Sequence, residues 1–191
     1  EAVQDGVLQA DSQWLASMSE ETAALAHLVD DLQTLSLGDA GQLRLERAEV
    51  AVHEVIERAV AGLPLHGLTL TQDVAADLLI FADARRIVQV LRNLLVNATT
   101  YAAATIAITA TRNDDRAEIR VADDGPGVPA EHVAKIFDRF YRADASRSRS
   151  TGGAGLGLAI AKQLVELHGG TIAYERPAFI ISLSLVRTLR S

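Results

Sequence analysis

A heptad of mostly apolar positions near the N-terminus is the first regular pattern in the chain. From Trp14 onward, such residues recur at alternating steps of three and four: Leu15, Met18, Thr22, Leu25, Val29 and Leu32. This spacing predicts one helix with the seam of a coiled coil or four-helix bundle, and Leu28 and Leu35 widen the seam to bundle width. We expect residues 1–8 to end a partner helix, 9–13 to form the turn, and the hairpin to pair with another copy or another chain. The alternative is a hairpin packed on its own globular domain.

The pattern changes at Gly38-Asp39-Ala40-Gly41, which we interpret as the boundary between a hairpin over residues 1–40 and a domain over residues 43–191. Asp83 is a predicted helix N-cap, and Gly169-Gly170 a predicted helix end. The patterns predict helices at 50–63, 84–99, 131–137 and 155–168, and strands at 43–45, 68–70, 78–81, 105–111, 116–122, 171–174 and 179–186. Helices and antiparallel strands in this order indicate an α+β fold, a two-layer α/β sandwich.

Composition excludes several classes of function. The absence of cysteine rules out disulfides, thiol catalysis and cysteine-bound zinc, and the five histidines lack a metal-ligand spacing. A net charge of −7 argues against a nucleic-acid partner. The sequence shows neither a membrane-spanning apolar run nor a signal peptide, so we expect a cytoplasmic location. The first residue is not methionine, which suggests a fragment whose full-length protein could be anchored in a membrane elsewhere.

A carboxylate and two glycines follow the predicted strand at 116–122. Asp123 would end this strand facing a cavity, where its side chain could accept a hydrogen bond from an amino group. Gly125 and Gly127 would let the backbone approach a flat ligand, because a β-carbon at either position would collide with it. The alternative is an ordinary Asp-Gly hairpin turn.

Two asparagines mark the helix predicted at 84–99. Asn93 and Asn97 are four residues apart and share a face with Gln89, which gives an otherwise apolar helix a polar stripe. Neutral amide oxygens suit Mg²⁺, whose charge is then balanced by phosphate groups. The alternative is a stripe that simply faces water.

A second glycine-rich stretch, Thr151 to Leu158, leads directly into an apolar helix. Backbone amides at such a helix N-terminus favour a phosphate, although a flexible linker would have a similar composition. The stretch lacks the Gly-Lys-Ser/Thr of a P-loop, and no strand precedes it as in a Rossmann turn. Before it, residues 137–150 are rich in arginine and serine. They predict a lid over 139–153 that orders on nucleotide binding, or else a solvated loop.

Together these stretches resemble the ATP-binding domain of sensor histidine kinases, in the GHKL superfamily with gyrase and mismatch-repair ATPases. The resemblance covers about residues 43–186 and implies the Bergerat-type ATP-binding fold. It rests on four short motifs: an asparagine box (Leu91–Ala98), a first glycine box (Asp123–Gly127), a phenylalanine box (Phe137–Phe140) and a second glycine box (Gly153–Leu158). The heptad segment resembles the second helix of the kinase dimerisation domain, and so implies a homodimer in the full protein.

The resemblance also implies roles for individual residues, with ATP and Mg²⁺ as cofactors. Asp123 would accept the adenine amino group, Asn97 would hold Mg²⁺, and Tyr101 would lie beside the adenosine. The residues implied in phosphoryl transfer are Asn93, Arg142 and Arg147. The remaining nucleotide contacts fall on Gly125, Gly127, Gly153, Gly155, Leu156 and Gly157.

Departures from the family pattern keep alternatives open. Members that hydrolyse ATP carry a glutamate where this chain has Asn93, which disfavours an ATPase and fits transfer to a histidine. Thr100 replaces a usual lysine, and Pro177-Ala178 replaces a usual Gly-Thr. No His-Glu-Leu-Arg-Thr-Pro acceptor stretch occurs in the 191 residues. We therefore expect the phosphoacceptor on a histidine-containing dimerisation domain, supplied either by a missing N-terminal part of the same protein or by a separate subunit, with a response regulator downstream. The alternative is a degenerate, non-catalytic nucleotide-binding or docking module.

Overall fold

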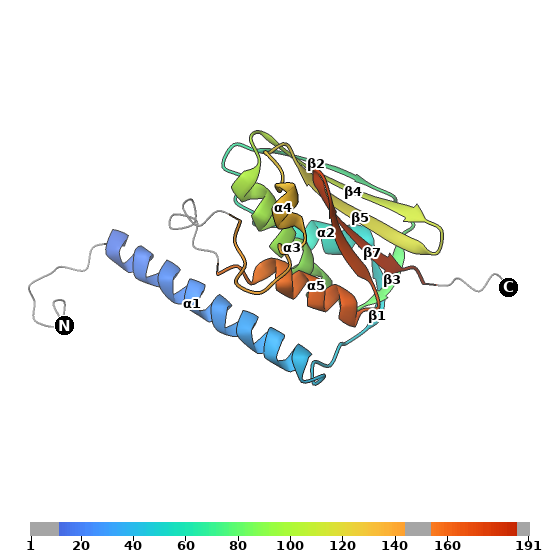
Figure 1. Cartoon of the computed structure of the whole chain (residues 1–191), viewed down its shortest axis with the longest axis horizontal. Coiled ribbons are helices and arrows are strands. Elements are labelled where there is room, and N and C mark those ends of the chain that lie inside the picture. Colours follow the sequence, from blue (N-terminus) through green and yellow to red (C-terminus); the bar gives the residue numbers. More distant parts are fainter. Residues whose placement is uncertain (1–11, 144–153, 187–191) are drawn as a thin grey trace, which may run out of the picture.

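The computed structural model describes residues 12–143 and 154–186. A long helix, α1 (Ser12–Asp39), extends beside a mixed α/β domain (Figure 1). This confirms the long helix expected from the heptad, whereas its expected partner helix over 1–8 lies outside the described residues. In the part of the chain that the structure describes, no helix is long and apolar enough to cross a membrane.

The domain is built on a five-stranded sheet in the order β2-β4-β5-β7-β6. β2 runs parallel to β4, and all other neighbours are antiparallel. The strands are β2 (Thr69–Val74), β4 (Thr105–Asn113), β5 (Arg116–Asp123), β6 (Thr171–Glu175) and β7 (Ala178–Ser184). The predicted hairpin at 105–122 is confirmed, because β4 pairs with β5 from Ile106 to Asn113.

A second, two-stranded sheet joins β1 (Ala48–Ala51) and β3 (Leu79–Ala82). The strand predicted at 43–45 is wrong, since residues 42–47 are irregular and the first strand begins at Ala48. The alternation of Leu43 and Leu45 is too short to decide this, because a strand forms only where a partner provides backbone hydrogen bonds. Here β3 pairs with 48–51 instead.

Helices α2 (Val52–Val60), α3 (Ala84–Tyr101) and α5 (Gly157–Leu167) pack with the sheet around one apolar core, and a short helix, α4 (Ala130–Val133), precedes α5 (Figure 1). The fully buried side chains include Ile56, Ile87, Leu91, Leu94, Leu95, Ile106, Ile108, Ile119 and Ile160. They come from α2, α3, β4, β5 and α5 alike, so a helical layer and a sheet layer share one core. The two-layer α/β sandwich is confirmed.

The N-terminus of α3 and the C-terminus of α5 meet at two buried polar residues. Asp83 caps α3, as predicted, and its Oδ1 accepts hydrogen bonds from the amides of Arg85 and Arg86. His168 connects the two helix ends, because its Nε2 accepts from the Asp83 amide while its Nδ1–H donates to the Leu164 carbonyl. These two hydrogen bonds assign the neutral Nδ1–H tautomer, and burial lowers the pKa of His168, which favours the neutral ring.

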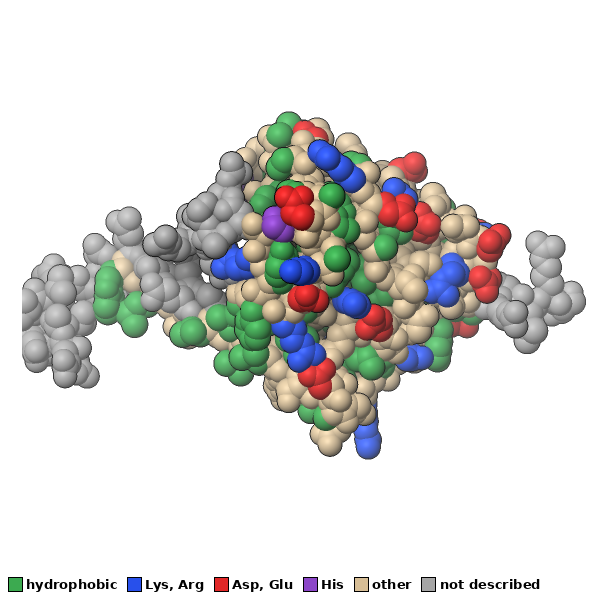
Figure 2. Space-filling model, viewed as in Figure 1, with side chains coloured by type: hydrophobic (Ala, Val, Ile, Leu, Met, Phe, Trp, Pro, Cys, Tyr) green, Lys and Arg blue, Asp and Glu red, His purple; other side chains and the backbone are tan. Residues whose placement is uncertain are grey.

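The heptad seam of α1 divides into two parts. Near the C-terminal end, Leu35 is 4% exposed and belongs to the core of the domain. Towards the N-terminal end, the seam faces outwards at Met18, Leu25, Val29 and Leu32, which are 47–65% exposed. Figure 2 shows hydrophobic side chains gathered over this helix. The helix thus packs on its own domain at one end and presents an apolar stripe along the rest.

Candidate nucleotide-binding site

The turn after β5 holds Asp123 at the end of a central strand. Its side chain is half-buried, and Oδ1 accepts a hydrogen bond from the Gly125 amide at 3.0 Å. Within the described residues, Oδ2 accepts no hydrogen bond and remains able to take one from a ligand. Burial raises the pKa of Asp123, and the neighbouring charge of Asp124 adds to this effect. The geometry is that of a carboxylate acceptor placed in a partly apolar site.

The two glycines of this turn are in close contact with neighbouring elements. A β-carbon on Gly125 would overlap the carbonyl oxygen of Tyr101, the last residue of α3. Gly127 has a φ of 69°, and a β-carbon there would lie 2.8 Å from the hydroxyl of Tyr174. That hydroxyl accepts from the Val128 amide at 2.9 Å. The turn therefore lies against the end of α3 on one side and against β6 on the other.

The polar stripe of α3 lies between this turn and the second glycine stretch. Asn93 and Asn97 are both half-buried, and Asn93 Nδ2 donates to the Gly157 carbonyl at 2.9 Å. In residues 12–143 and 154–186, the Asn97 amide has no hydrogen-bond partner. A half-buried amide in this state is suited to a ligand that brings its own polar groups.

The second glycine stretch forms the N-terminus of α5. The helix begins at Gly157, two residues later than predicted, and no side chain caps it. Its first backbone N–H groups are therefore open to an anion. Gly155 has a φ of 72°, which permits the sharp turn into the helix. Leu156 is 2% exposed and buried in the core, so it can contribute to a ligand site only through its backbone.

Comparison with known proteins identifies the family that has these features. The family described as "Histidine kinase-, DNA gyrase B-, and HSP90-like ATPase" matches residues 82–187. This chain belongs to that family.

Curated relatives are sensor kinases. "Signal transduction histidine-protein kinase BaeS" of Escherichia coli is 38% identical over 187 residues, covering 94% of this chain and 40% of that protein. "Sensor histidine kinase WalK" of Bacillus subtilis is 35% identical over 167 residues, covering 83% of this chain and 27% of that protein. The chain thus spans less than half the length of these relatives.

Solved histidine kinases have the same fold. The histidine kinase AdeS of Acinetobacter baumannii superposes with a TM-score of 0.79 at 29% identity, covering 96% of this chain and 90% of that one. Full-length ShkA in complex with AMPPNP superposes with a TM-score of 0.77 at 27% identity, covering 94% of this chain and 40% of that one. The Bergerat-type fold of histidine kinases expected from the sequence is confirmed.

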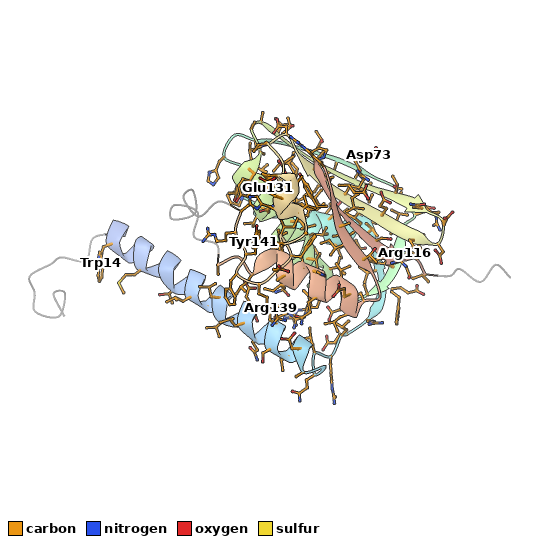
Figure 3. The ribbon with its side chains drawn as sticks, viewed as in Figure 1. Trp14, Asp73, Arg116, Glu131, Arg139 and Tyr141 are labelled. Carbon is orange, nitrogen blue, oxygen red and sulfur yellow. The ribbon has the colours of Figure 1, made fainter. Side chains whose placement is uncertain are left out.

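The phenylalanine box of the kinase family lies between α4 and the second glycine stretch. Phe140 is 63% exposed with a φ of 61°, and its amide donates to the Gly155 carbonyl at 2.9 Å. Arg139 lies between α1 and α5 (Figure 3) and pairs with Asp39, Nη1 to Oδ2, at 2.6 Å. Arg142, exposed, follows this box. The predicted phosphate contacts Arg147 and Gly153, with most of the predicted lid, lie outside the described residues.

Three residues that hold the first glycine box were missed by sequence reasoning. Asp124 accepts hydrogen bonds from the backbone amides of Ala103 and Ala104, which join α3 to β4, and of Thr105, the first residue of β4. Tyr174 contacts Gly127 as described above, and Arg176 donates to the Pro126 carbonyl at 2.9 Å. The two consecutive aspartates, Asp123 and Asp124, were a signal that could have indicated a structural role for the second carboxylate. Tyr174 and Arg176 lie some 50 residues further along the chain and have no local signal.

Proposed function

We propose that this chain is the ATP-binding catalytic part of a two-component sensor histidine kinase. The proposal rests on one observation: α3 contacts the second glycine stretch near its middle and the first glycine box at its C-terminal end. Asn93 bonds to the Gly157 carbonyl, and the Tyr101 carbonyl lies against Gly125. These residues are about two helical turns apart, roughly 12 Å along the axis. The span suits a nucleoside triphosphate lying along the polar stripe, with its base at Asp123 and its phosphates at the start of α5.

At the base end, Asp123 distinguishes an amino group from a carbonyl. Its Oδ2 would accept a hydrogen bond from the exocyclic amine of adenine, while Oδ1 stays bonded to the Gly125 amide. A carboxylate facing a carbonyl oxygen would instead place two acceptors in contact. The turn is therefore specific for adenine over a 6-oxo purine, and Tyr101 would lie beside the adenosine.

At the phosphate end, the ligands are backbone amides, amide side chains and arginines. The uncapped start of α5 at Gly157 would bind phosphate oxygens, assisted by Gly155 and Gly153. Asn97 would supply one oxygen ligand to Mg²⁺, which fits an amide that has no hydrogen-bond partner among the described residues, and a bound Mg²⁺ would neutralise phosphate charge. Arg142 and Arg147 would neutralise further charge on the transferred group.

The proposed reaction is transfer of the γ-phosphoryl group to a histidine outside these 191 residues. A neutral ring nitrogen attacks the γ-phosphorus, the bond from that phosphorus to the β–γ bridging oxygen breaks, and ADP leaves. Asn93 cannot act as a base, and the attack requires no base, because the attacking ring nitrogen carries a lone pair and no hydrogen. The residues of this site act by positioning the phosphates and stabilising their charge.

The exposed stripe of α1 is the proposed docking surface for the acceptor. Its apolar side chains would be buried in a bundle with histidine-bearing dimerisation helices, from the same protein or another subunit. The phosphohistidine would then serve a response regulator.

Phosphoryl transfer in trans tests this function. A histidine-bearing dimerisation domain is mixed with this chain and ATP labelled at the γ-phosphate. We expect acid-labile, base-stable label on the added domain and none on this chain. Asp123→Asn should bind Mg·ATP more than about tenfold more weakly, since a charge-assisted bond contributes about 1.5–3 kcal/mol. Asp115→Asn, at the far end of the hairpin, is the matched control. Bound ATP without any transfer to a cognate acceptor would contradict the proposal.

A further inference from the structure

Asp124 makes more backbone contacts than any role in a simple turn requires. Its Oδ1 accepts hydrogen bonds from three consecutive amides, those of Ala103 at 2.8 Å, Ala104 at 3.0 Å and Thr105 at 3.0 Å. Oδ2 adds a longer contact of 3.1 Å to the Ala104 amide. The Asp124 amide in turn donates to the Thr105 carbonyl at 3.2 Å. These bonds lower the pKa of Asp124 to about 2, so the side chain is a carboxylate at neutral pH.

Two of these amides belong to the segment that connects α3 to β4, and the third, that of Thr105, begins β4. Only one residue separates Tyr101, at the end of α3, from Ala103, the first donor. Asp124 itself lies between Asp123, the proposed adenine acceptor, and Gly125, which touches the Tyr101 carbonyl. The carboxylate therefore connects the two walls of the proposed base pocket.

The β4–β5 ladder places Asp123 opposite Ile106, and the Asp124 carboxylate extends this connection to Ala103 and Ala104, before the start of β4. The contact between Gly125 and the Tyr101 carbonyl prevents closer approach, and the Asp124 bonds prevent separation. Since Asp123 and Tyr101 would lie on opposite sides of the base, a small shift of either wall would change the hydrogen bond that Oδ2 can form.

We propose that Asp124 is a positioning residue for adenine recognition, which rests on the proposed ATP site. It holds the α3–β4 segment against the β5 turn, so that Asp123 and Tyr101 keep the separation that admits adenine. The acceptor that matters is Oδ1, because all three amides bond to it.

This proposal predicts different nucleotide affinities for three substitutions of Asp124. Asp124→Ala removes every acceptor. Asp124→Asn keeps a carbonyl oxygen at the position of Oδ1 and should rescue the variant, although the charge is lost. Asp124→Glu keeps the charge but moves the acceptor by one methylene. Asp115→Ala is the control, since it removes one exposed carboxylate beyond the opposite end of β5, about 30 Å away at strand rise.

The measurement is the affinity of the full chain for fluorescent ATP and ITP analogues with Mg²⁺. ITP replaces the amino group of adenine by a carbonyl and carries a hydrogen on N1, so the ATP/ITP ratio reports on recognition of this edge of the base, where Asp123 would bind. We expect Asp124→Ala to lose about tenfold in ATP affinity, the equivalent of one hydrogen bond, with little change for ITP. Asp124→Asn should stay within about threefold of wild type, as one neutral acceptor replaces a charged one. Amide hydrogen exchange at residues 103–105 should accelerate in the alanine variant and not in the control.

Several results would overturn the assignment. A folded Asp124→Ala with the wild-type ATP/ITP ratio would refute it, and so would an asparagine variant as weak as alanine. If the alanine variant does not fold, Asp124→Glu decides: a wild-type ratio would count against the role of Oδ1, and a collapsed ratio would support it. Wild-type chain that binds neither nucleotide would refute the proposed function itself. Exchange at residues 103–105 would then still show whether Asp124 holds the segment.

Discussion

Replacing Gly125 by alanine tests the contact between the first glycine box and α3. The added methyl would overlap the Tyr101 carbonyl oxygen and lie 2.9 Å from its carbon and 2.7 Å from Asp123 Oδ1. Favourable contacts for carbon are about 3.5–4.0 Å, so the turn must move away from α3 by up to about 1 Å. The conformation of Gly125 is not left-handed, and the cost is therefore steric.

The magnitude follows from the groups that collide. Overpacking costs about 1–3 kcal/mol, and the upper end applies because backbone rather than a flexible side chain must yield. For a chain of this size, about 3 kcal/mol lowers the melting temperature by about 6–12 °C. The displaced Asp123 should also lose its bond to adenine, which weakens ATP binding by about tenfold, or about 1.4 kcal/mol.

Thermal melting with and without Mg·ATP measures both effects. At a concentration 100 times the dissociation constant, ATP should stabilise the wild type by about 2.7 kcal/mol, and a tenfold weaker variant by about 1.4 kcal/mol. Gly62→Ala is the control, because Gly62 has a φ of 76° with no atoms within 4 Å of a β-carbon. It should lose about 1–2 kcal/mol through strain alone and keep the full ATP effect. A Gly125→Ala protein that melts like wild type, or keeps the full shift, would show that this reasoning is wrong.

Three further predictions concern pH and the docking surface. Because the pKa of His168 in the folded chain is lowered below its ordinary 6.5, the unfolded chain takes up the proton first as the pH falls. Unfolding by urea should therefore show the free energy of unfolding decreasing below about pH 6.5, and His168→Gln should give a flatter profile. The pKa of Asp124 is lowered by hydrogen bonds that favour its charged form, so its contribution to stability is present above the ordinary 3.8 and is lost as the pH falls to about 2. Asp124→Asn should therefore flatten the acid limb of the same profile. Replacing Leu25 and Val29 by aspartate should reduce phosphoryl transfer in trans by about tenfold or more, as two exposed apolar contacts are lost, while ATP titration stays unchanged. Equal transfer by this double variant would exclude the α1 stripe as the docking surface.

Features that depend on neighbours in sequence were predictable. The Asp83 cap, the β4–β5 hairpin and the buried face of α3 follow from a capping residue, a turn and the periods of 2 and 3.6. The glycine and asparagine boxes were also visible, because each is a short run whose residue types already limit its chemistry. Element ends were less certain: the helix predicted at 131–137 is only α4 (Ala130–Val133), followed by turns.

The tertiary structure alone decided which distant groups meet. The sequence determined which residues form the asparagine and glycine boxes and their order along the chain. It did not determine that Asn93 donates to the Gly157 carbonyl or that the Tyr174 hydroxyl accepts a hydrogen bond from the Val128 amide. It predicted the heptad of α1, but not that its seam is buried at Leu35 and exposed at Leu25. It showed Asp124 without indicating its three amide partners. Such contacts depend on strand register and on how the layers pack, and these are set by the free energy of the whole core rather than by any local pattern.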